Sequence, residues 1–236
     1  MFQDGTMKIV NVNGSPHAEI GNTQALVKRF VKGLEESGFT IELVNHFLVK
    51  KNIEECRGCT RCMRKGACVM EKTDDVKAIA DDLKSANLVV FSSPIYVLNV
   101  TGYMKKYIDR TAYMTHRLEL EGKPGVYVLA SQGLGVTETS DYMRRIMEAM
   151  GVDVVGGICG NAIIHGQFLD EEEIAEDIRK AISYLTDGNV KKEKVSSGEA
   201  ERRDKFKMLM QKEDISKKLF GADYKYWKER EKRQNE

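Results

Sequence analysis

Short runs rich in Val and Ile alternate with longer segments of helical periodicity through the first 188 residues of this chain, and no other feature narrows the choice of fold as much. The runs are bounded by Gly, Ser, Asn or Pro, which is typical of buried strands. Strands are therefore predicted at 7–13, 39–45, 87–93, 125–131 and 152–160. Between them, apolar residues at helical spacing predict helices over 27–34, 76–83, 104–111 and 174–185.

Helix-length connections return the chain to the same edge of a sheet, so these strands are predicted to be parallel. The expected fold class is α/β, with an open, doubly wound sheet of five strands. Ligands of such sheets bind outside the carboxyl ends of the strands, where the strand order reverses. The loops that follow the strands are therefore the places to look for chemistry.

The loop after the first strand, "NGSPHAEIGNTQ" at 13–24, runs directly into a predicted helix. Its glycines allow a tight bend, and backbone N–H groups at a helix start bind anions. Because it has neither Gly-Lys-Ser/Thr nor the GxGxxG spacing, a monophosphate fits it better than a pyrophosphate. Its Ser, Asn and Thr residues are also ordinary helix caps, so that alternative stays open.

Two further loops carry groups suited to a flat heterocycle. In "SSPIYVLNVTGYMKKYIDR", residues 92–110, Pro94 rigidifies the turn, Tyr96 offers an aromatic face and Asn99 offers amide groups. In "SQGLGVTET", residues 131–139, two glycines allow the backbone to approach a ligand closely.

Four of the five cysteines lie in "CRGCTRCMRKGAC", residues 56–68, with the spacing C-x2-C-x2-C-x5-C. A looped backbone could wrap these thiolates around one [4Fe–4S] cluster, whose usual ligands are cysteines. Free thiols, a zinc site and disulfides are the alternatives. Zinc more often uses two separated knuckles. Disulfides are disfavoured in the cytoplasm, where thiols stay reduced.

Cytoplasmic localisation is expected because the chain has no long apolar run and no signal-peptide pattern at its start. A formal net charge of +1 with 42% hydrophobic residues favours neither a nucleic-acid binder nor a disordered chain. No membrane partner is expected.

The three loops and the cysteine segment together resemble the iron–sulfur flavoproteins, within the flavodoxin-like superfamily of FMN-binding reductases, over about residues 7–188. The resemblance implies a flavodoxin-like fold, FMN at the three loops, a [4Fe–4S] cluster and a homodimer or homotetramer. It implies phosphate contacts from the first loop and flavin contacts from the other two. One departure is His17, where many members of the family carry Arg, which weakens the expected charged contact to the phosphate. The implied FMN residues are Ser15, His17, Asn22, Thr23, Pro94, Ile95, Tyr96, Asn99, Ser131, Gln132, Gly133 and Gly135, and the implied cluster ligands are Cys56, Cys59, Cys62 and Cys68.

The resemblance also implies a flavin-dependent oxidoreductase. Electrons would come from ferredoxin or NAD(P)H and leave to a small acceptor such as dioxygen, hydrogen peroxide or a quinone. A cluster-free NAD(P)H-dependent FMN or quinone reductase is the main alternative. An electron carrier like flavodoxin is a weaker one, because flavodoxins are usually strongly acidic.

The remaining residues, 189–236, are predicted to form a charged, amphipathic helical extension of the domain at 1–188. They carry 15 Lys and Arg against 10 Asp and Glu, and the preceding 22 basic and 26 acidic residues give that domain a charge of −4. Two amphipathic stretches, 202–220 and 223–231, are expected to pack against the domain or across a subunit interface. Within the domain, we interpret Lys105, Lys106 and Arg110 as a solvated helix face, and His116 and Arg117 as a solvated helix end.

Overall fold

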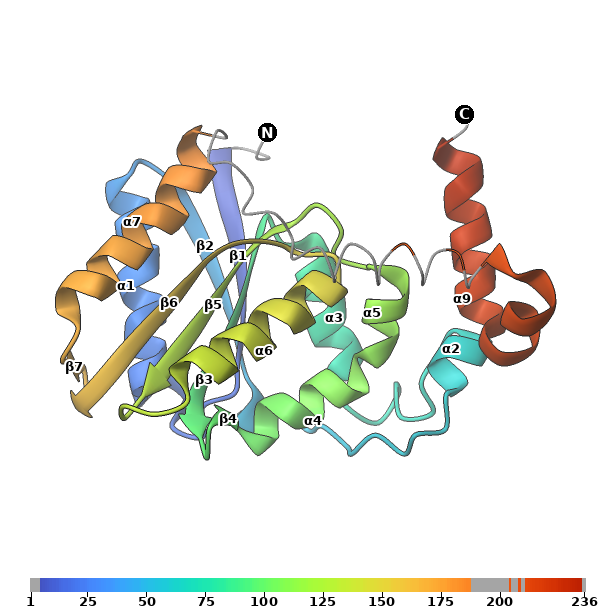
Figure 1. The fold of residues 1–236 in the computed structure, drawn as a ribbon, viewed down its shortest axis with the longest axis horizontal. Coiled ribbons are helices and arrows are strands. Elements are labelled where there is room, and N and C mark those ends of the chain that lie inside the picture. The colour runs from blue at the N-terminus through green and yellow to red at the C-terminus, as the bar shows by residue number, and fades with distance from the viewer. Residues whose placement is uncertain (1–4, 188–203, 205–207, 209–210, 235–236) are drawn as a thin grey trace.

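The computed structural model describes residues 5–187, 204, 208 and 211–234 (Figure 1). Five long strands form a parallel sheet in the order β2-β1-β3-β5-β6. This is the flavodoxin-like order, with its switch point between β1 and β3. The prediction of a five-stranded parallel sheet is confirmed. The strands are β1 (Thr6–Asn13), β2 (Thr40–Phe47), β3 (Leu88–Tyr96), β5 (Pro124–Ser131) and β6 (Asp153–Ile164).

Two strands of two residues each were not predicted, because so short a strand leaves no periodic pattern. Strand β4 (Asn99–Val100) pairs antiparallel with β3, and β7 (Gln167–Phe168) pairs antiparallel with β6. Each pairs with the last residues of a long strand, at its carboxyl end. They therefore shape the edge at which a ligand is expected.

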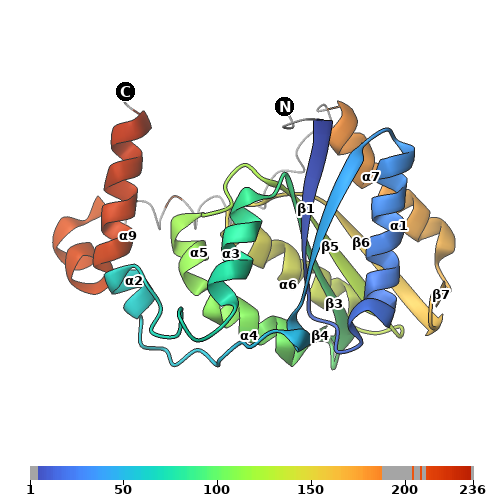
Figure 2. The same ribbon diagram turned by 180° about the vertical axis from the view of Figure 1, so that it is seen from behind.

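Helices cover both faces of the sheet (Figures 1 and 2). Helices α1 (Asn22–Glu36) and α7 (Glu171–Asp187) enclose one hydrophobic cluster. The other cluster lies under α3 (Val76–Ser85), α4 (Gly102–Arg110), α5 (Ala112–Arg117) and α6 (Val136–Ala149). Along β3, Leu88 and Val90 face the first cluster, whereas Val89 and Phe91 face the second. Because both faces are buried, the strands read as continuous apolar runs.

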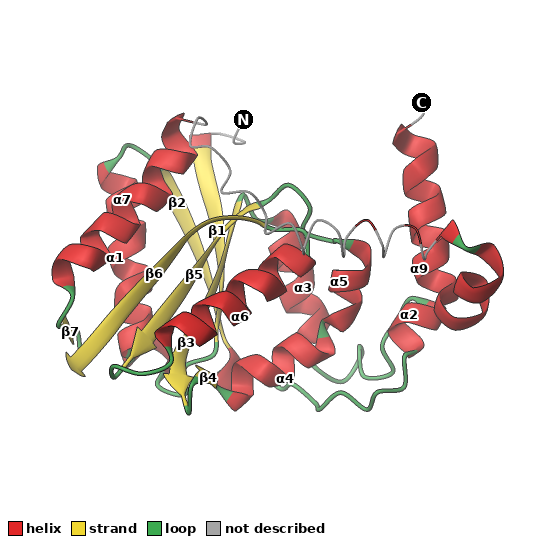
Figure 3. Cartoon of the chain, in the orientation of Figure 1, coloured by secondary structure: helices red, strands yellow, loops and turns green. Residues whose placement is uncertain are grey.

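The cysteine segment leaves the sheet after β2 and the single-turn helix η3 (Leu48–Lys50). It contains the short helix α2 (Arg61–Lys65) and returns to α3. The C-terminal helix α9 (Glu213–Gln234) contacts α2 and α5 at the end of the molecule farthest from β7 (Figure 3). Its backbone kinks at Phe220.

The predicted packing of the extension against the domain is seen for the described part of the C-terminus. The beginning of the first amphipathic stretch (202–220) lies outside the described residues, since only Asp204 and Met208 are described within 202–210. The domain boundary at 188–189 also falls outside them and stays a prediction. Among the described helices, none is long and apolar enough to span a membrane.

Candidate functional site

Thr101 joins the loops that follow β1 and β3 at the carboxyl edge of the sheet. Its hydroxyl donates to the Gly14 carbonyl oxygen at 2.7 Å, and its backbone N–H donates to Ser93 Oγ at 3.2 Å. The same hydroxyl accepts the Met104 N–H at 3.2 Å and so caps α4. A Cβ on Gly14 would lie 2.8 Å from Met104 Cβ, so this approach requires glycine. The two loops are therefore held together before any ligand binds.

The loop after β1 presents polar groups that do not cap the helix they precede. Helix α1 follows Gly21 and has no side-chain cap, which removes the ordinary capping interpretation. Ser15 is buried, and its Oγ accepts the backbone N–H of the exposed His17 at 3.2 Å. Asn22 Oδ1 accepts the Gly166 N–H at 2.8 Å, which leaves its amide hydrogens available. The Thr23 hydroxyl is buried and has no hydrogen-bond partner among the described residues.

A buried network of polar side chains lies beneath this loop, and the sequence analysis did not identify it. Asn13 Nδ2 donates to Gln24 Oε1 at 3.0 Å, which ties the end of β1 to α1. Asn11 Nδ2 donates to Asn45 Oδ1 at 2.8 Å, and Ser92 Oγ donates to Asn11 Oδ1 at 2.7 Å. Satisfied buried networks of this kind restrict a site to one arrangement. The only sequence signal for it is three amides and a serine inside otherwise apolar strands.

The predicted flavin loops meet at the turn between β3 and β4. Val97 and Leu98 form this turn with φ of 49° and 64°, the left-handed values of a primed hairpin turn. Gly135, at φ 80°, lies so close that a Cβ there would be 2.7 Å from Leu98 Cα. Thr139 Oγ1 donates to the Leu98 carbonyl oxygen at 3.2 Å. The loop after β5 is thus fastened to the loop after β3.

The remaining predicted flavin residues line the same edge. Pro94 and Ile95 are half-buried, while Tyr96 and Asn99 are exposed. Ser131 is buried, and its Oγ accepts the Gly133 N–H at 2.9 Å, which forms the turn that carries the exposed Gln132. The structure therefore brings the residues of all three loops to one edge of the sheet.

An open cavity of about 620 Å³ lies beside these loops. Pro16, Tyr96 and Thr101 contribute to it from the two loops, and α4 supplies one wall with Tyr103. Cys56 lines the same cavity from the cysteine segment. Of the twelve predicted FMN residues, only Tyr96 is among those that line this cavity, so Tyr96 and the first cysteine border one space.

All four cysteines of the segment 56–68 are free thiols, so the disulfide alternative is not what the structure has. Cys56 and Cys59 are exposed, whereas Cys62 and Cys68 are half-buried. Burial raises the pKa of the Cys62 thiol. Within the described residues, no three Cys, His, Asp or Glu side chains are gathered closely enough to hold a metal ion. The set of donors, four unpaired thiols in one loop, nevertheless fits a [4Fe–4S] cluster.

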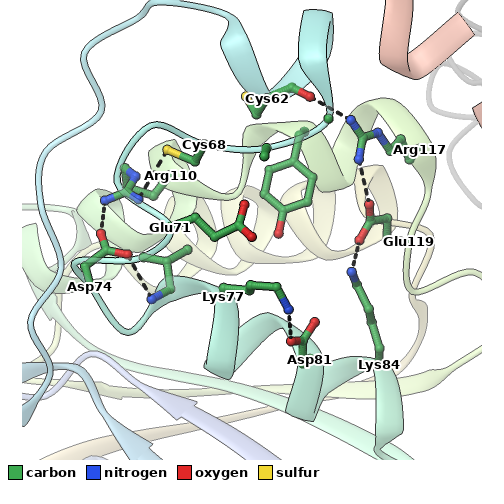
Figure 4. A pocket seen from close by; sticks show the side chains of 14 residues that line it. Cys62, Cys68, Glu71, Asp74, Lys77, Asp81, Lys84, Arg110, Arg117 and Glu119 are labelled. Atoms are coloured by element: carbon green, nitrogen blue, oxygen red, sulfur yellow. Dashed lines mark hydrogen bonds and ion pairs between the residues drawn. The ribbon is translucent and has the colours of Figure 1, made fainter.

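A second cavity, of about 190 Å³, lies on the inner side of the cysteine segment (Figure 4). Cys62 and Cys68 line it together with charged side chains from α3, α4 and α5, and the Glu71 carboxylate points into it. Arg110 Nη2 donates to Cys68 Sγ at 3.4 Å. Arg117 Nη2 donates to the Cys62 carbonyl oxygen at 2.7 Å.

These contacts correct the interpretation of two arginines. Arg110 does not belong to a solvated face, because its side chain is 1% exposed and forms an ion pair with the fully buried side chain of Asp74. Arg117 is not a solvated helix end, because its side chain is 10% exposed. Lys105, by contrast, is exposed and pairs with Asp109, as interpreted from the sequence. Sequence periodicity could not identify the arginines' partners, since these come from other elements.

Both the sequence and the fold of this chain are similar to those of known proteins. Residues 7–162 match the family described as NADPH-dependent FMN reductase. An iron–sulfur flavoprotein of Archaeoglobus fulgidus is 33% identical over 95% of this chain and 99% of its own length. An iron–sulfur flavoprotein of Clostridioides difficile is 29% identical over 76% of each chain. Among solved structures, the NAD(P)H:quinone oxidoreductase from Methanothermobacter marburgensis superposes with a TM-score of 0.56, at 19% identity over 77% of this chain and 96% of that one.

Proposed function

The chain belongs to the iron–sulfur flavoproteins of the NADPH-dependent FMN reductase family and is a flavin-dependent oxidoreductase, and from that premise we propose that it passes electrons between a [4Fe–4S] cluster on its cysteine segment and FMN at the three loops. The main support for this proposal is the position of the cysteine segment. The cysteine segment lies between two cavities, with Cys56 on the open cavity at the flavin loops and Cys62 and Cys68 on the inner one. FMN takes up electrons singly or in pairs, and a [4Fe–4S] cluster takes up one, so together they convert between the two regimes.

The phosphate of FMN would be held by the loop after β1. The buried hydroxyl of Thr23, which has no partner among the described residues, and the uncapped start of α1 support this assignment. Ser15 and the side-chain amide of Asn22 would add donors, and His17 would contribute its exposed imidazole. Pro94, Ile95, Tyr96 and Asn99 would flank the isoalloxazine, and Ser131, Gln132, Gly133 and Gly135 would close over it.

Cys56, Cys59, Cys62 and Cys68 would be the cluster ligands. The backbone around them turns sharply, with left-handed φ at Gly58, Thr60 and Gly66, as expected of a chain that wraps around a compact group. The Arg110 N–H aimed at Cys68 Sγ would act on the cluster as well. Hydrogen bonds to ligand sulfurs raise the reduction potential of a cluster.

The charge around the cysteines supports a one-electron donor protein with an acidic surface, such as a ferredoxin. Residues 57–72 carry five Lys and Arg against one Glu. Arg57, Arg61, Arg64 and Lys65 are all exposed near the exposed Cys59. Opposite charges on the two partners would speed their association. A small acceptor, such as dioxygen, hydrogen peroxide or a quinone, would enter the open cavity beside Tyr96 and Tyr103.

A homodimer or homotetramer is supported by exposed apolar side chains around the flavin loops. Val97 is 97% exposed and Leu134 is 77% exposed. Apolar side chains gathered at one edge mark a surface that another chain covers.

A cluster-free FMN or quinone reductase driven by NAD(P)H is the second candidate. The observation in its favour is that the described cysteine sulfurs are not gathered into a metal site. Such a protein would oxidise NAD(P)H directly, and its cysteines would have no redox part in that reaction.

The deciding experiment measures iron and acid-labile sulfide per FMN in protein purified without oxygen. We expect about four iron and four sulfide per chain. Cys62→Ser should lower both, while Cys159→Ser, outside the segment, should leave both unchanged. Bound FMN with no iron or sulfide, even after anaerobic reconstitution, would leave the second candidate.

A further inference from the structure

The short helix α2, which carries Cys62, depends on other elements for its position. It has five residues, and none of them is buried. Its N-cap residue, Thr60, makes no side-chain capping bond. An isolated helix of this length is not stable in water, because the cost of nucleation exceeds the gain from so few hydrogen bonds. Contacts with the rest of the protein must therefore hold α2 in place.

Helix α9 supplies one set of these contacts through small residues. A Cβ on Gly221 would lie 3.3 Å from the Arg64 carbonyl oxygen. A Cβ on Gly66, just after α2, would lie 3.6 Å from Ala222 Cβ. The two backbones can approach this closely because the residues between them are glycine and alanine. The kink at Phe220 comes directly before this contact in the chain.

A chain of buried polar contacts links α9 to the backbone of Cys62. Asp223 on α9 is fully buried. Its Oδ1 accepts Arg117 Nε–H at 2.7 Å, and its Oδ2 lies 2.9 Å from His116 Nδ1. Arg117 Nη2 then donates to the Cys62 carbonyl oxygen at 2.7 Å. The guanidinium is planar, so fixing one edge with Asp223 also fixes the edge that binds Cys62.

Helix α9 is itself anchored to the domain one turn beyond Asp223. Trp227 is buried against Leu118, and its Nε1–H donates to the His116 carbonyl oxygen at 2.9 Å. Arg230 forms an ion pair with Glu121. Helix α9 therefore connects the end of α5, which is fixed in the domain, with α2, which has no buried residue.

We propose that α9 clamps the cysteine segment, and that Asp223 is a positioning residue that holds Cys62 through Arg117. The C-terminal extension then helps to fix the position of the cysteine segment. The consequence for a cluster rests on the function proposed above, since it requires Cys62 to be a ligand. The contacts by which α9 holds the segment do not require a bound cluster.

The test measures the alkylation rate of each cysteine by mass spectrometry in the full-length, cluster-free protein. Breaking a buried ion pair should open the segment far more often, so Asp223→Ala should accelerate alkylation of Cys62 at least about tenfold. The already exposed Cys59 serves as the internal reference and should change by no more than about twofold. Asp214→Asn is the matched control, because it removes a carboxylate from an exposed position on the same helix.

Two milder variants keep the test decisive if Asp223→Ala does not fold. Asp223→Asn keeps the volume and one acceptor, so a smaller acceleration at Cys62 is expected. Arg117→Lys keeps the positive charge but cannot span Asp223 and the Cys62 carbonyl, so it should also accelerate Cys62. Unchanged Cys62 rates in the folded variants would overturn the clamp. Iron content, measured separately after reconstitution, tests the cluster, so failure of one proposal is distinguishable from failure of the other.

Discussion

Replacing Arg110 with methionine should destabilise the protein far more than a surface charge change would. The Arg110 side chain is 1% exposed, and that of its partner Asp74 is fully buried. Without the guanidinium, the Asp74 carboxylate keeps, within the described part of the chain, only two long contacts, from the Glu54 N–H at 3.4 Å and the Val76 N–H at 3.3 Å. Leaving a buried charge unpaired costs about 3–5 kcal/mol of unfolding free energy. For a chain of this size, that is a fall in Tm of roughly 6–20 °C.

The assay is thermal and urea unfolding of the cluster-free protein, with two comparison variants. Lys105→Met removes an exposed ion pair from the same helix and should cost less than about 1 kcal/mol. The double variant Arg110→Met with Asp74→Asn removes both charges and should recover most of the loss. If Arg110→Met behaves like Lys105→Met, or if the double variant is no more stable than the single one, the reasoning from an unpaired buried carboxylate is wrong.

Arg110 also donates a hydrogen bond to Cys68 Sγ, so Arg110→Met has two effects: it leaves the Asp74 carboxylate unpaired, and it removes this hydrogen bond. The double variant should regain stability without regaining that hydrogen bond. Cys68 should therefore be alkylated faster in the double variant than in the unmodified protein. Equal rates would show that the Arg110 contact does not restrain Cys68.

Four further outcomes are expected. Thr23→Val should leave the Tm of the FMN-free protein unchanged or raised, because the Thr23 hydroxyl has no partner among the described residues, yet weaken FMN binding about tenfold in a fluorescence titration. Gly135→Ala should cost more than the about 1–2 kcal/mol expected from its left-handed φ alone, because the added Cβ would also meet Leu98 Cα, and it should weaken FMN binding; unfolding and the same titration measure the two effects. Burial lowers the pKa of His46, so below pH 6.5 the unfolded chain binds a proton at this residue more readily than the folded protein does. The free energy of unfolding should therefore fall as the pH drops below 6.5. His46→Gln should remove that part of the pH dependence of unfolding. Burial raises the pKa of the Cys159 thiol to about 11, so mass spectrometry at pH 8 should find it unalkylated while the exposed cysteines react.

The sequence analysis predicted the sheet well because the signals for it are local. All five parallel strands lie where Val- and Ile-rich runs predict them. The predicted stripes of α1 and α3 are buried. Helix α6 gave no such stripe, because the residues it buries are Thr139, Met143 and Met147, which are less distinctive than aliphatic residues at that spacing. The β3–β4 turn was missed because Val97 and Leu98 are not the residues that favour a primed turn.

The sequence by itself determined the parallel sheet, the three loops at its carboxyl edge and the grouping of four cysteines, because each of these depends on residues close together in the chain. Only the tertiary structure decided what surrounds those cysteines. Arg110 meets Cys68 across 42 positions, and Arg117 meets Asp223 across 106. By local pattern these arginines lie on solvated helix surfaces. Their burial follows from the packing of the cysteine segment and α9 over them, since a charged side chain is taken out of water only where a distant part of the chain supplies its partner.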